Sequence, residues 1–209
     1  MEITYLGESC VRLRGRETQV LVDPPEGQLP GLSKTSPDMV VRTTGRTDPE
    51  HLRPAAGRSQ QVAGPGEFEV RGVTVHGIDA GEGHTLMRIE IDDVVVVSLG
   101  RFDRQLTEDE VDALGHVDVL VVPVGGGDAL APQAASKLVN AVEPAIVVPV
   151  RYRNAASPGS GELEPVDAFA KEMGLAEGTF QSQPKLNLNG AMSSADDSRV
   201  VILEPRGIG

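Results

Sequence analysis

The 209-residue sequence has a formal net charge of −12, no tryptophan and few aromatic residues, so aliphatic side chains must form its core. A chain this acidic repels polyanions, which argues against nucleic acid or an anionic membrane as its main partner. The single cysteine, Cys10, excludes an intramolecular disulfide and a cysteine-rich zinc site, and we expect its thiol to be buried as a small apolar group.

The first half of the sequence predicts short β-strands separated by tight turns. Short apolar or alternating runs bounded by Gly, Pro and Asp are typical of strands. The runs are residues 3–6, 11–13, 20–22, 39–41, 61–63, 68–70, 73–75, 86–91 and 94–97. Arg71-Gly72 indicates a hairpin between two of these strands, and the four consecutive valines at 94–97 are typical of a strand buried on both faces.

The second half predicts helices that alternate with strands. Thr107 and Glu110 have the spacing of a capping box, which predicts a helix over residues 107–114. Two further helices are expected over 132–142 and 165–173, and strands over 117–124, 145–150 and 200–203. Antiparallel strands followed by βαβ order favour the α/β class. We predict an αββα sandwich, two mixed sheets with helices outside, in a single domain over residues 1–209.

A glycine-rich segment, Gly125-Gly126-Gly127, lies between a predicted strand and a predicted helix. Such a loop can bind phosphate through backbone N–H groups near a helix N-terminus. Here it lacks both the lysine–hydroxyl pair of a P-loop and the GxGxxG spacing of a dinucleotide-binding loop. A simple strand-to-helix turn is therefore the favoured interpretation, and a phosphate-binding loop is the alternative.

Five segments, in order along the chain, resemble the small hydrolases of the metallo-beta-lactamase fold, including the ascorbate-6-phosphate lactonase-like group. The segments are residues 3–10 (ITYLGESC), 20–24 (VLVDP), 65–70 (PGEFEV), 118–127 (DVLVVPVGGG) and 143–149 (EPAIVVP). The resemblance covers the whole chain, and it implies the metallo-beta-lactamase fold.

The resemblance also implies where the metal ligands of such a hydrolase would lie. The family's loop after the strand at 39–41 reads T-H-x-H-x-D-H, and its side chains hold one or two divalent ions that activate a water molecule. In this sequence the three histidine positions of that loop hold Thr44, Arg46 and Pro49, and Asp48 alone is retained. The loop has therefore lost most of the ligands that the resemblance implies.

Three ligand positions outside this loop are changed as well. Glu8 replaces a histidine in the opening segment, Arg101 stands where an aspartate is expected, and Arg151 stands where the last histidine is expected. His84 is the one further candidate ligand, whereas the other histidines are expected at structural or surface positions: His51, His76 and His116. A zinc site needs three or four protein ligands. We therefore expect no metal and no other cofactor.

The replacements bring positive charge to the former metal site. The arginines and the acids expected near them are Arg46, Arg101, Arg151, Glu8, Asp23 and Asp48. We hypothesise that guanidinium groups pair with these carboxylates and fill the former metal cavity. The alternative is that the arginines bind a small anionic ligand, such as a phosphate or a carboxylate.

These observations favour a catalytically inactive hydrolase-fold protein, a pseudo-hydrolase with a binding, regulatory or assembly role. The alternative is a metal-dependent hydrolase of lactone- or phosphoester-type substrates whose ligands have moved. The resemblance also implies a homo-oligomer. The sequence shows neither a signal peptide at its start nor an apolar run that could span a bilayer, so we expect a cytoplasmic protein.

Overall fold

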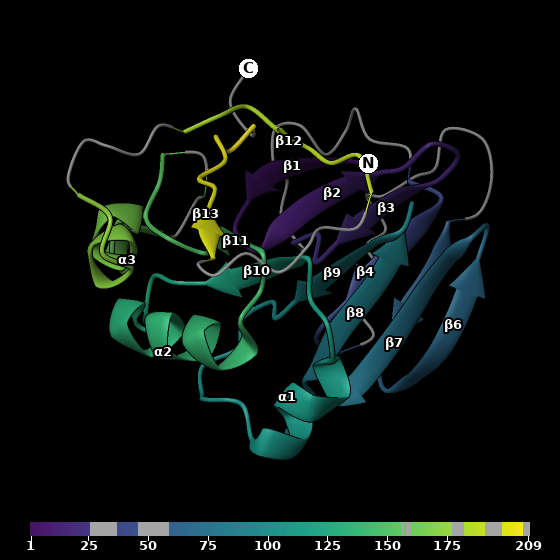
Figure 1. Ribbon diagram of the computed structural model, residues 1–209, viewed down its shortest axis with the longest axis horizontal. Helices are drawn as coiled ribbons and strands as arrows, with labels where there is room; N and C mark the ends of the chain where they lie inside the picture. The colour runs from purple at the N-terminus through teal and green to yellow at the C-terminus, as the bar shows by residue number, and fades with distance from the viewer. Residues whose placement is uncertain are drawn as a thin grey trace.

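Two β-sheets lie face to face in the computed structural model, which describes residues 1–25, 37–45, 59–155, 157, 160–176, 182–190 and 198–206 (Figure 1). The first sheet has the order β12-β1-β2-β3-β4-β5. Its strands are β1 (Glu2–Gly7), β2 (Cys10–Arg14), β3 (Gln19–Val22), β4 (Met39–Arg42), β5 (Gln60–Ala63) and β12 (Leu186–Asn187). Neighbouring strands are antiparallel from β12 through β1 and β2 to β3, and they are parallel from β3 through β4 to β5.

The second sheet has the order β13-β11-β10-β9-β8-β7-β6. Its strands are β6 (Gly66–Val70), β7 (Val73–Asp79), β8 (Thr85–Ile91), β9 (Val94–Ser98), β10 (Val119–Pro123), β11 (Ile146–Val150) and β13 (Arg199–Val200). The strands from β6 to β9 are antiparallel, whereas β9, β10, β11 and β13 are parallel. Both sheets are therefore mixed, which confirms the predicted α/β sandwich.

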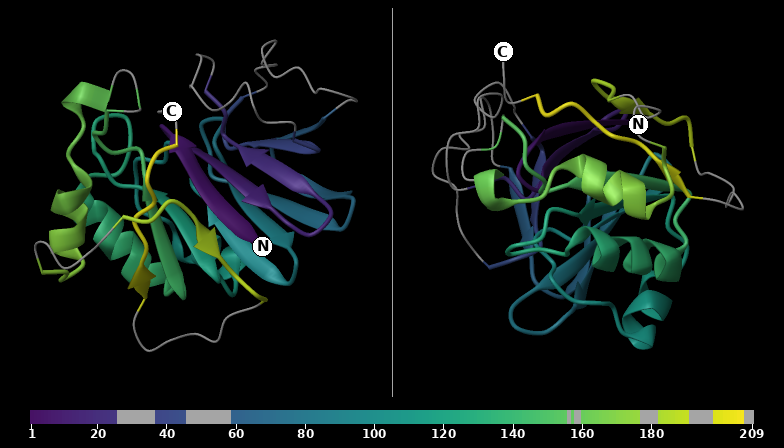
Figure 2. Two further views of the ribbon diagram at one scale, coloured as in Figure 1. Left: turned by 90° about the horizontal axis from the view of Figure 1, so that it is seen from above. Right: turned by 90° about the vertical axis from the view of Figure 1, so that its left-hand side faces the viewer.

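The described helices lie beside the second sheet, on the side opposite the first sheet (Figure 2). They are α1 (Glu108–Leu114), α2 (Pro132–Val142) and α3 (Val166–Glu172), with a short 3-10 helix at Ser160–Glu162. The predicted capping box begins α1: Thr107 accepts from the backbone N–H of Glu110, and the Glu110 carboxylate accepts from that of Thr107. In the described residues, no helix is both long enough and apolar enough to cross a membrane.

Aliphatic side chains from both sheets form one hydrophobic core. Every residue of β9, β10 and β11 is buried, because the first sheet covers one face of these strands and the helices cover the other. This burial confirms the interpretation of the valine run in β9. Cys10 is also fully buried, as expected, in a small cluster with Leu6 and Leu21.

The closing segment of the chain is the main error of the sequence-based prediction. A strand was expected over residues 200–203, but β13 covers only Arg199–Val200. The Val201 N–H still donates to the Val147 carbonyl of β11, after which the backbone leaves the sheet and Leu203 forms an isolated bridge with Gln183. The two-residue strand β12, which pairs with β1 at Glu2 and Ile3, was not predicted. Two residues are too few to show an alternating pattern.

Candidate functional site

Turns and loops from both sheets meet at one edge of the sandwich, where the parallel strands have their carboxyl ends. Ligands of open α/β sheets bind in the crevice outside such strand ends. The polar side chains at this edge follow β1, β3, β4, β9, β10 and β11. Among the described residues they include Glu8, Asp23, Thr43, Arg101, Asp128 and Arg151.

Arg151, the residue directly after β11, pairs with two carboxylates. Its Nη1 contacts Oε2 of Glu8. On its other edge, Nε lies 3.0 Å from Oδ1 of Asp128 and Nη2 lies 2.8 Å from Oδ2 of the same side chain. This two-point contact is the strongest geometry for an arginine–carboxylate pair. Burial lowers the pKa of the Arg151 guanidinium from its ordinary value, but an arginine remains charged in proteins.

Arg101 joins the same two acids from the loop after β9. Its Nη1 lies 3.4 Å from Oδ2 of Asp128, and its Nη2 lies 3.8 Å from Oε2 of Glu8. Two positive and two negative side chains therefore alternate around a closed ring. We refer to Glu8, Arg101, Asp128 and Arg151 as the arginine–carboxylate cluster.

The backbone at Glu8 and Arg151 is shaped to form this cluster. Both residues have positive φ angles, 55° and 51°, a conformation that residues other than glycine adopt rarely. The Arg151 N–H donates to the Glu8 carbonyl over 2.8 Å, and the Tyr5 hydroxyl donates to the same carbonyl over 2.9 Å. Ser157 Oγ accepts from the Glu8 N–H. Uncommon backbone conformations that are held by several contacts often mark functional sites.

Asp23 lies at the same edge, but it pairs with Thr43 rather than with an arginine. Its Oδ1 accepts from the Thr43 N–H over 2.8 Å and from the Thr43 hydroxyl over 3.0 Å. Burial raises the pKa of the Asp23 carboxyl to about 6, against the opposing effect of the hydrogen bonds from Thr43. Gly100 packs so closely here that a Cβ would collide with the Thr43 hydroxyl. The chain can therefore bring Arg101 to this edge only with glycine before it.

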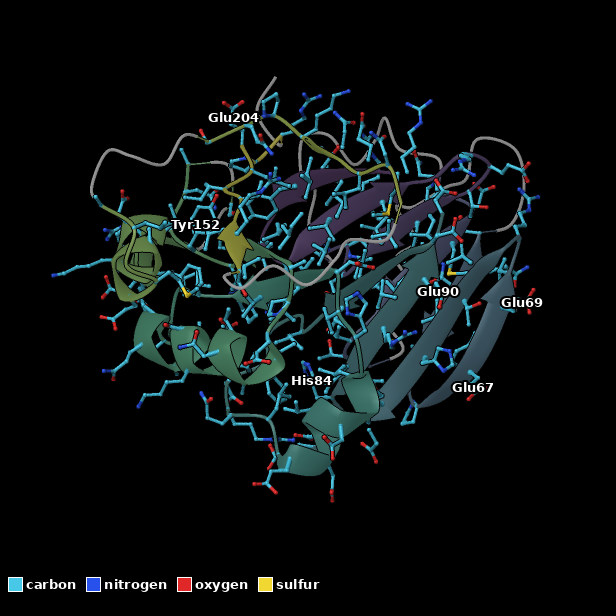
Figure 3. The ribbon with its side chains drawn as sticks, viewed as in Figure 1. Glu67, Glu69, His84, Glu90, Tyr152 and Glu204 are labelled. Atoms are coloured by element: carbon cyan, nitrogen blue, oxygen red, sulfur yellow. The ribbon has the colours of Figure 1, made fainter. Side chains whose placement is uncertain are left out.

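His84 supports the loop that carries Arg101. It precedes β8 (Figure 3), its Nε2 lies 2.8 Å from the Leu99 carbonyl, and its ring lies 5.2 Å from that of Phe102. Burial lowers the pKa of His84, so its imidazole is neutral near pH 7. Because a carbonyl only accepts, Nε2 carries the proton of the neutral ring. Thr44 and His84 also pair in an isolated antiparallel β-bridge, which places Thr44 next to His84.

The described side chains at this edge do not fit a divalent metal ion. Glu8 is already paired with two guanidinium groups, Asp23 is held by Thr43, and the Nε2 of His84 is held by a carbonyl. Within the described ranges, no three His, Cys, Asp or Glu side chains gather as a metal-binding group. The positions Arg46, Asp48, Pro49 and His51 lie outside the described residues.

Asp128 is the member of the cluster that sequence reasoning missed. It comes directly after the glycine-rich segment, for which a phosphate-binding loop was the alternative interpretation. The Gly126 N–H donates to the Leu130 carbonyl within the chain. A Cβ at Gly125 would collide with the Arg151 carbonyl, so the loop passes directly over Arg151. The glycines thus let the loop place the Asp128 side chain against Arg151. In the sequence, an acidic residue directly after the glycine-rich segment could have indicated Asp128 as a candidate site residue.

Two facing mixed sheets, with charged loops at the carboxyl ends of the parallel strands, have the architecture of the metallo-beta-lactamase fold. A family model described as the beta-lactamase superfamily domain matches residues 2–151. The chain therefore belongs to the metallo-beta-lactamase superfamily.

Several relatives extend this comparison. A UPF0173 metal-dependent hydrolase from Methanoregula boonei is 26% identical over 190 aligned residues, covering 73% of this chain and 82% of that protein. A Thermotoga maritima structure, described as a Zn-dependent hydrolase of the superfamily, has a TM-score of 0.78 at 24% identity over 97% of this chain and 98% of that one. The metallo hydrolase Igni18 from Ignicoccus hospitalis has a TM-score of 0.66 at 18% identity, over 98% and 95%. The two structures support the fold.

Proposed function

We propose that this chain is a non-catalytic member of the superfamily, with a binding, regulatory or assembly role. The proposal depends on the arginine–carboxylate cluster. Arg101 and Arg151 stand at positions where the sequence resemblance implies metal ligands, and both contact the Glu8 carboxylate. Fixed guanidinium groups then supply the positive charge that metal ions supply in a hydrolase.

Four of the described hydroxyl and thiol groups near the cluster, those of Tyr5, Ser9, Cys10 and Ser157, support a non-catalytic role. Burial raises the pKa of the Cys10 thiol and of the Tyr5 hydroxyl far above their ordinary values, so both keep their protons. The Ser9 hydroxyl donates to the Gly100 carbonyl, and Ser157 Oγ accepts from the Glu8 N–H. A nucleophilic mechanism needs a hydroxyl or thiol beside a general base. These four groups make structural contacts instead.

The second candidate is a metal-dependent hydrolase whose ligands have moved. The specific observation in its favour is the relative from Methanoregula boonei, which is named as a metal-dependent hydrolase. Under this alternative, the ligands would include side chains outside the described residues, of which Asp48 and His51 have suitable donor atoms.

Metal analysis separates the two candidates. The purified protein is loaded with Zn²⁺ or Mn²⁺, dialysed against a weak chelator and measured by elemental analysis, and the Thermotoga maritima relative is treated in parallel for comparison. The first proposal expects far less than one ion per chain. Retention of about one ion per chain would overturn it, because a site that survives the chelator needs three or four ligands. An Asp48→Asn/His51→Ala variant that loses this ion would then support the second candidate.

An activity screen gives a second, independent readout. Lactone, phosphodiester and β-lactam probes are incubated with the metal-loaded and the metal-free protein. We expect no turnover above the buffer rate in either sample. Metal-dependent turnover would support the second candidate, and the probe that reacts would indicate its substrate class.

For the assembly role, we propose that the chain forms a homo-oligomer. Light scattering tests this part of the proposal, and a measured mass equal to that of one chain, 22.1 kDa, would contradict it.

A further inference from the structure

The arginine–carboxylate cluster has an inner half and an outer half. The inner side chains are buried: Glu8 is 9% exposed and Arg151 is 10% exposed. The outer side chains face the solvent: Asp128 is 45% exposed and Arg101 is 50% exposed. A molecule in solution can therefore reach one carboxylate and one guanidinium group, whereas the inner pair stays covered.

Asp128 lies on the two arginines in the way that a bound carboxylate ligand would. Both of its oxygens face the Nε and Nη2 edge of Arg151, and Oδ2 also contacts Arg101. This fork is the geometry with which arginine recognises carboxylate and phosphate groups in general. Glu8 balances one of the two positive charges from the inside. Among the ion pairs of the described residues, the second charge is balanced by an exposed acid on a loop, Asp128.

The loop holds Asp128 through few other contacts. The chain is fixed on either side of it, where the Glu164 N–H donates to the Gly125 carbonyl and the Gly126 N–H donates to the Leu130 carbonyl. Between these points, Gly127 has a φ of 69°, which glycine adopts without strain. In the part of the chain that is described, the hydrogen bonds and ion pairs of the Asp128 side chain are all with the two arginines.

We propose that Arg101 and Arg151 form a binding site for the carboxylate or phosphate group of a small anionic ligand, and that Asp128 is an intramolecular occupant which the ligand displaces. This inference rests on the proposed function, since it requires that arginines rather than metal ions occupy this edge. Asp128 then sets the affinity of the site. Because it is tethered next to the arginines, a ligand must compete with a high local concentration of carboxylate.

Removal of the Asp128 charge tests this competition. In Asp128→Asn the side chain keeps its size but no longer competes as an anion. We expect it to bind inorganic phosphate or acetate at least about tenfold more tightly than the unmodified protein. In the variant, the state in which no carboxylate occupies the two arginines is no longer a minor fraction of the molecules. Binding is measured by isothermal titration calorimetry. Both probes are used because carboxylate and phosphate share the chemistry of the site, and the tighter probe indicates which group the ligand carries.

Two control variants separate a specific site from a general charge effect. Glu69→Gln removes one negative charge from β6 (Figure 3), the edge strand at the end of the second sheet away from β11, which Arg151 follows. We expect its affinity for both probes to equal that of the unmodified protein. Asp128→Asn/Arg101→Gln removes the outer guanidinium as well, and we expect it to lose the gained affinity. Asp128→Ala serves as a second variant, and we expect either anion to raise its melting temperature more than that of the unmodified protein.

Metal content is measured on the same samples, so that the two proposals can fail separately. If the metal-free Asp128→Asn protein binds neither probe more tightly than Glu69→Gln does, and anions do not stabilise Asp128→Ala, the displacement proposal is wrong while the proposed function stands. It is also wrong if the double variant keeps the gained affinity. If the protein instead retains a stoichiometric metal ion, the proposed function fails first.

Discussion

Two arginines in this protein form similar forked contacts with carboxylates in different surroundings. Arg151 lies buried at the strand ends, between Glu8 and Asp128. Arg104 lies half-exposed beside α1, where its Nη1 and Nη2 lie 2.9 Å and 2.6 Å from the two oxygens of Glu110. It also packs over the Phe102 ring and donates to the Ala80 carbonyl. Geometry alone does not set the contribution of an ion pair to stability, because the cost of losing one partner depends on the desolvation and the remaining contacts of the other.

The largest effect is expected for Arg151→Ala. The substitution leaves the buried Glu8 carboxylate without its main partner, and we expect the free energy of unfolding to fall by about 3 kcal/mol. Urea denaturation measures this loss. As a control, Glu8→Gln/Arg151→Ala removes the unpaired charge as well and should recover part of the stability. A melting temperature that is unchanged in Arg151→Ala would show that the cluster does not stabilise the fold.

A smaller effect is expected for Arg104→Ala. The Glu110 carboxylate is buried to the same degree as that of Glu8, but it keeps its capping contacts with Thr107 after the substitution, and the guanidinium that is lost is half-exposed. We expect a loss of about 1 kcal/mol, mostly from the ion pair and from the contact with Phe102. The same denaturation series measures it. A loss as large as that of Arg151→Ala would mean that the capping contacts with Thr107 do not compensate Glu110 for the lost guanidinium.

The Arg104–Glu110 pair also predicts a dependence of stability on acid. The hydrogen bonds from Arg104 lower the pKa of Glu110 from 4.5 to about 2. A lowered carboxyl pKa stabilises the fold above the pKa of the unfolded chain, and this stability is lost as the pH falls toward the folded value. We therefore expect the free energy of unfolding to depend less on pH in Glu110→Gln than in the unmodified protein between about pH 5 and about pH 2. If the free energy of unfolding, measured by urea denaturation at several pH values, changed with pH equally in Glu110→Gln and in the unmodified protein, the lowered pKa of Glu110 would be contradicted.

Local sequence patterns predicted the elements that carry the two regions. The capping box of Thr107 and Glu110 located the start of α1, and the helix over 132–142 matches α2 residue for residue. The apolar runs of β9 to β11 were recognised because strands buried on both faces need apolar side chains throughout. The short strand β12 was not recognised, and β13 was expected with other bounds, because tertiary contacts rather than periodicity determine where these strands pair.

The candidate site was predictable only in part. Resemblance to a family pointed to Glu8, Arg101 and Arg151, and the structure brings these three side chains together. Asp128 could not be located in the same way, because its contact with Arg151 depends on the path of a glycine-rich loop. Asp23 was expected near the arginines, and the charges of Arg42 and Arg101 do act on it, but its hydrogen bonds are with Thr43. The tertiary structure, rather than the local sequence, determines which carboxylate pairs with which arginine.

The smallest effect is expected for Arg101→Ala, the other arginine of the same cluster. Its guanidinium is half-exposed and lies 3.4 Å and 3.8 Å from the nearest carboxylate oxygens, so water can replace most of its contacts. We expect a loss of less than about 1 kcal/mol in the urea series, because exposed ion pairs contribute little. Arg101→Lys serves as the matched control that keeps the charge, and it should match the unmodified protein. If Arg101→Ala were as unstable as Arg151→Ala, both arginines would be structural, and the outer half of the cluster would be too tightly held to exchange Asp128 for a ligand.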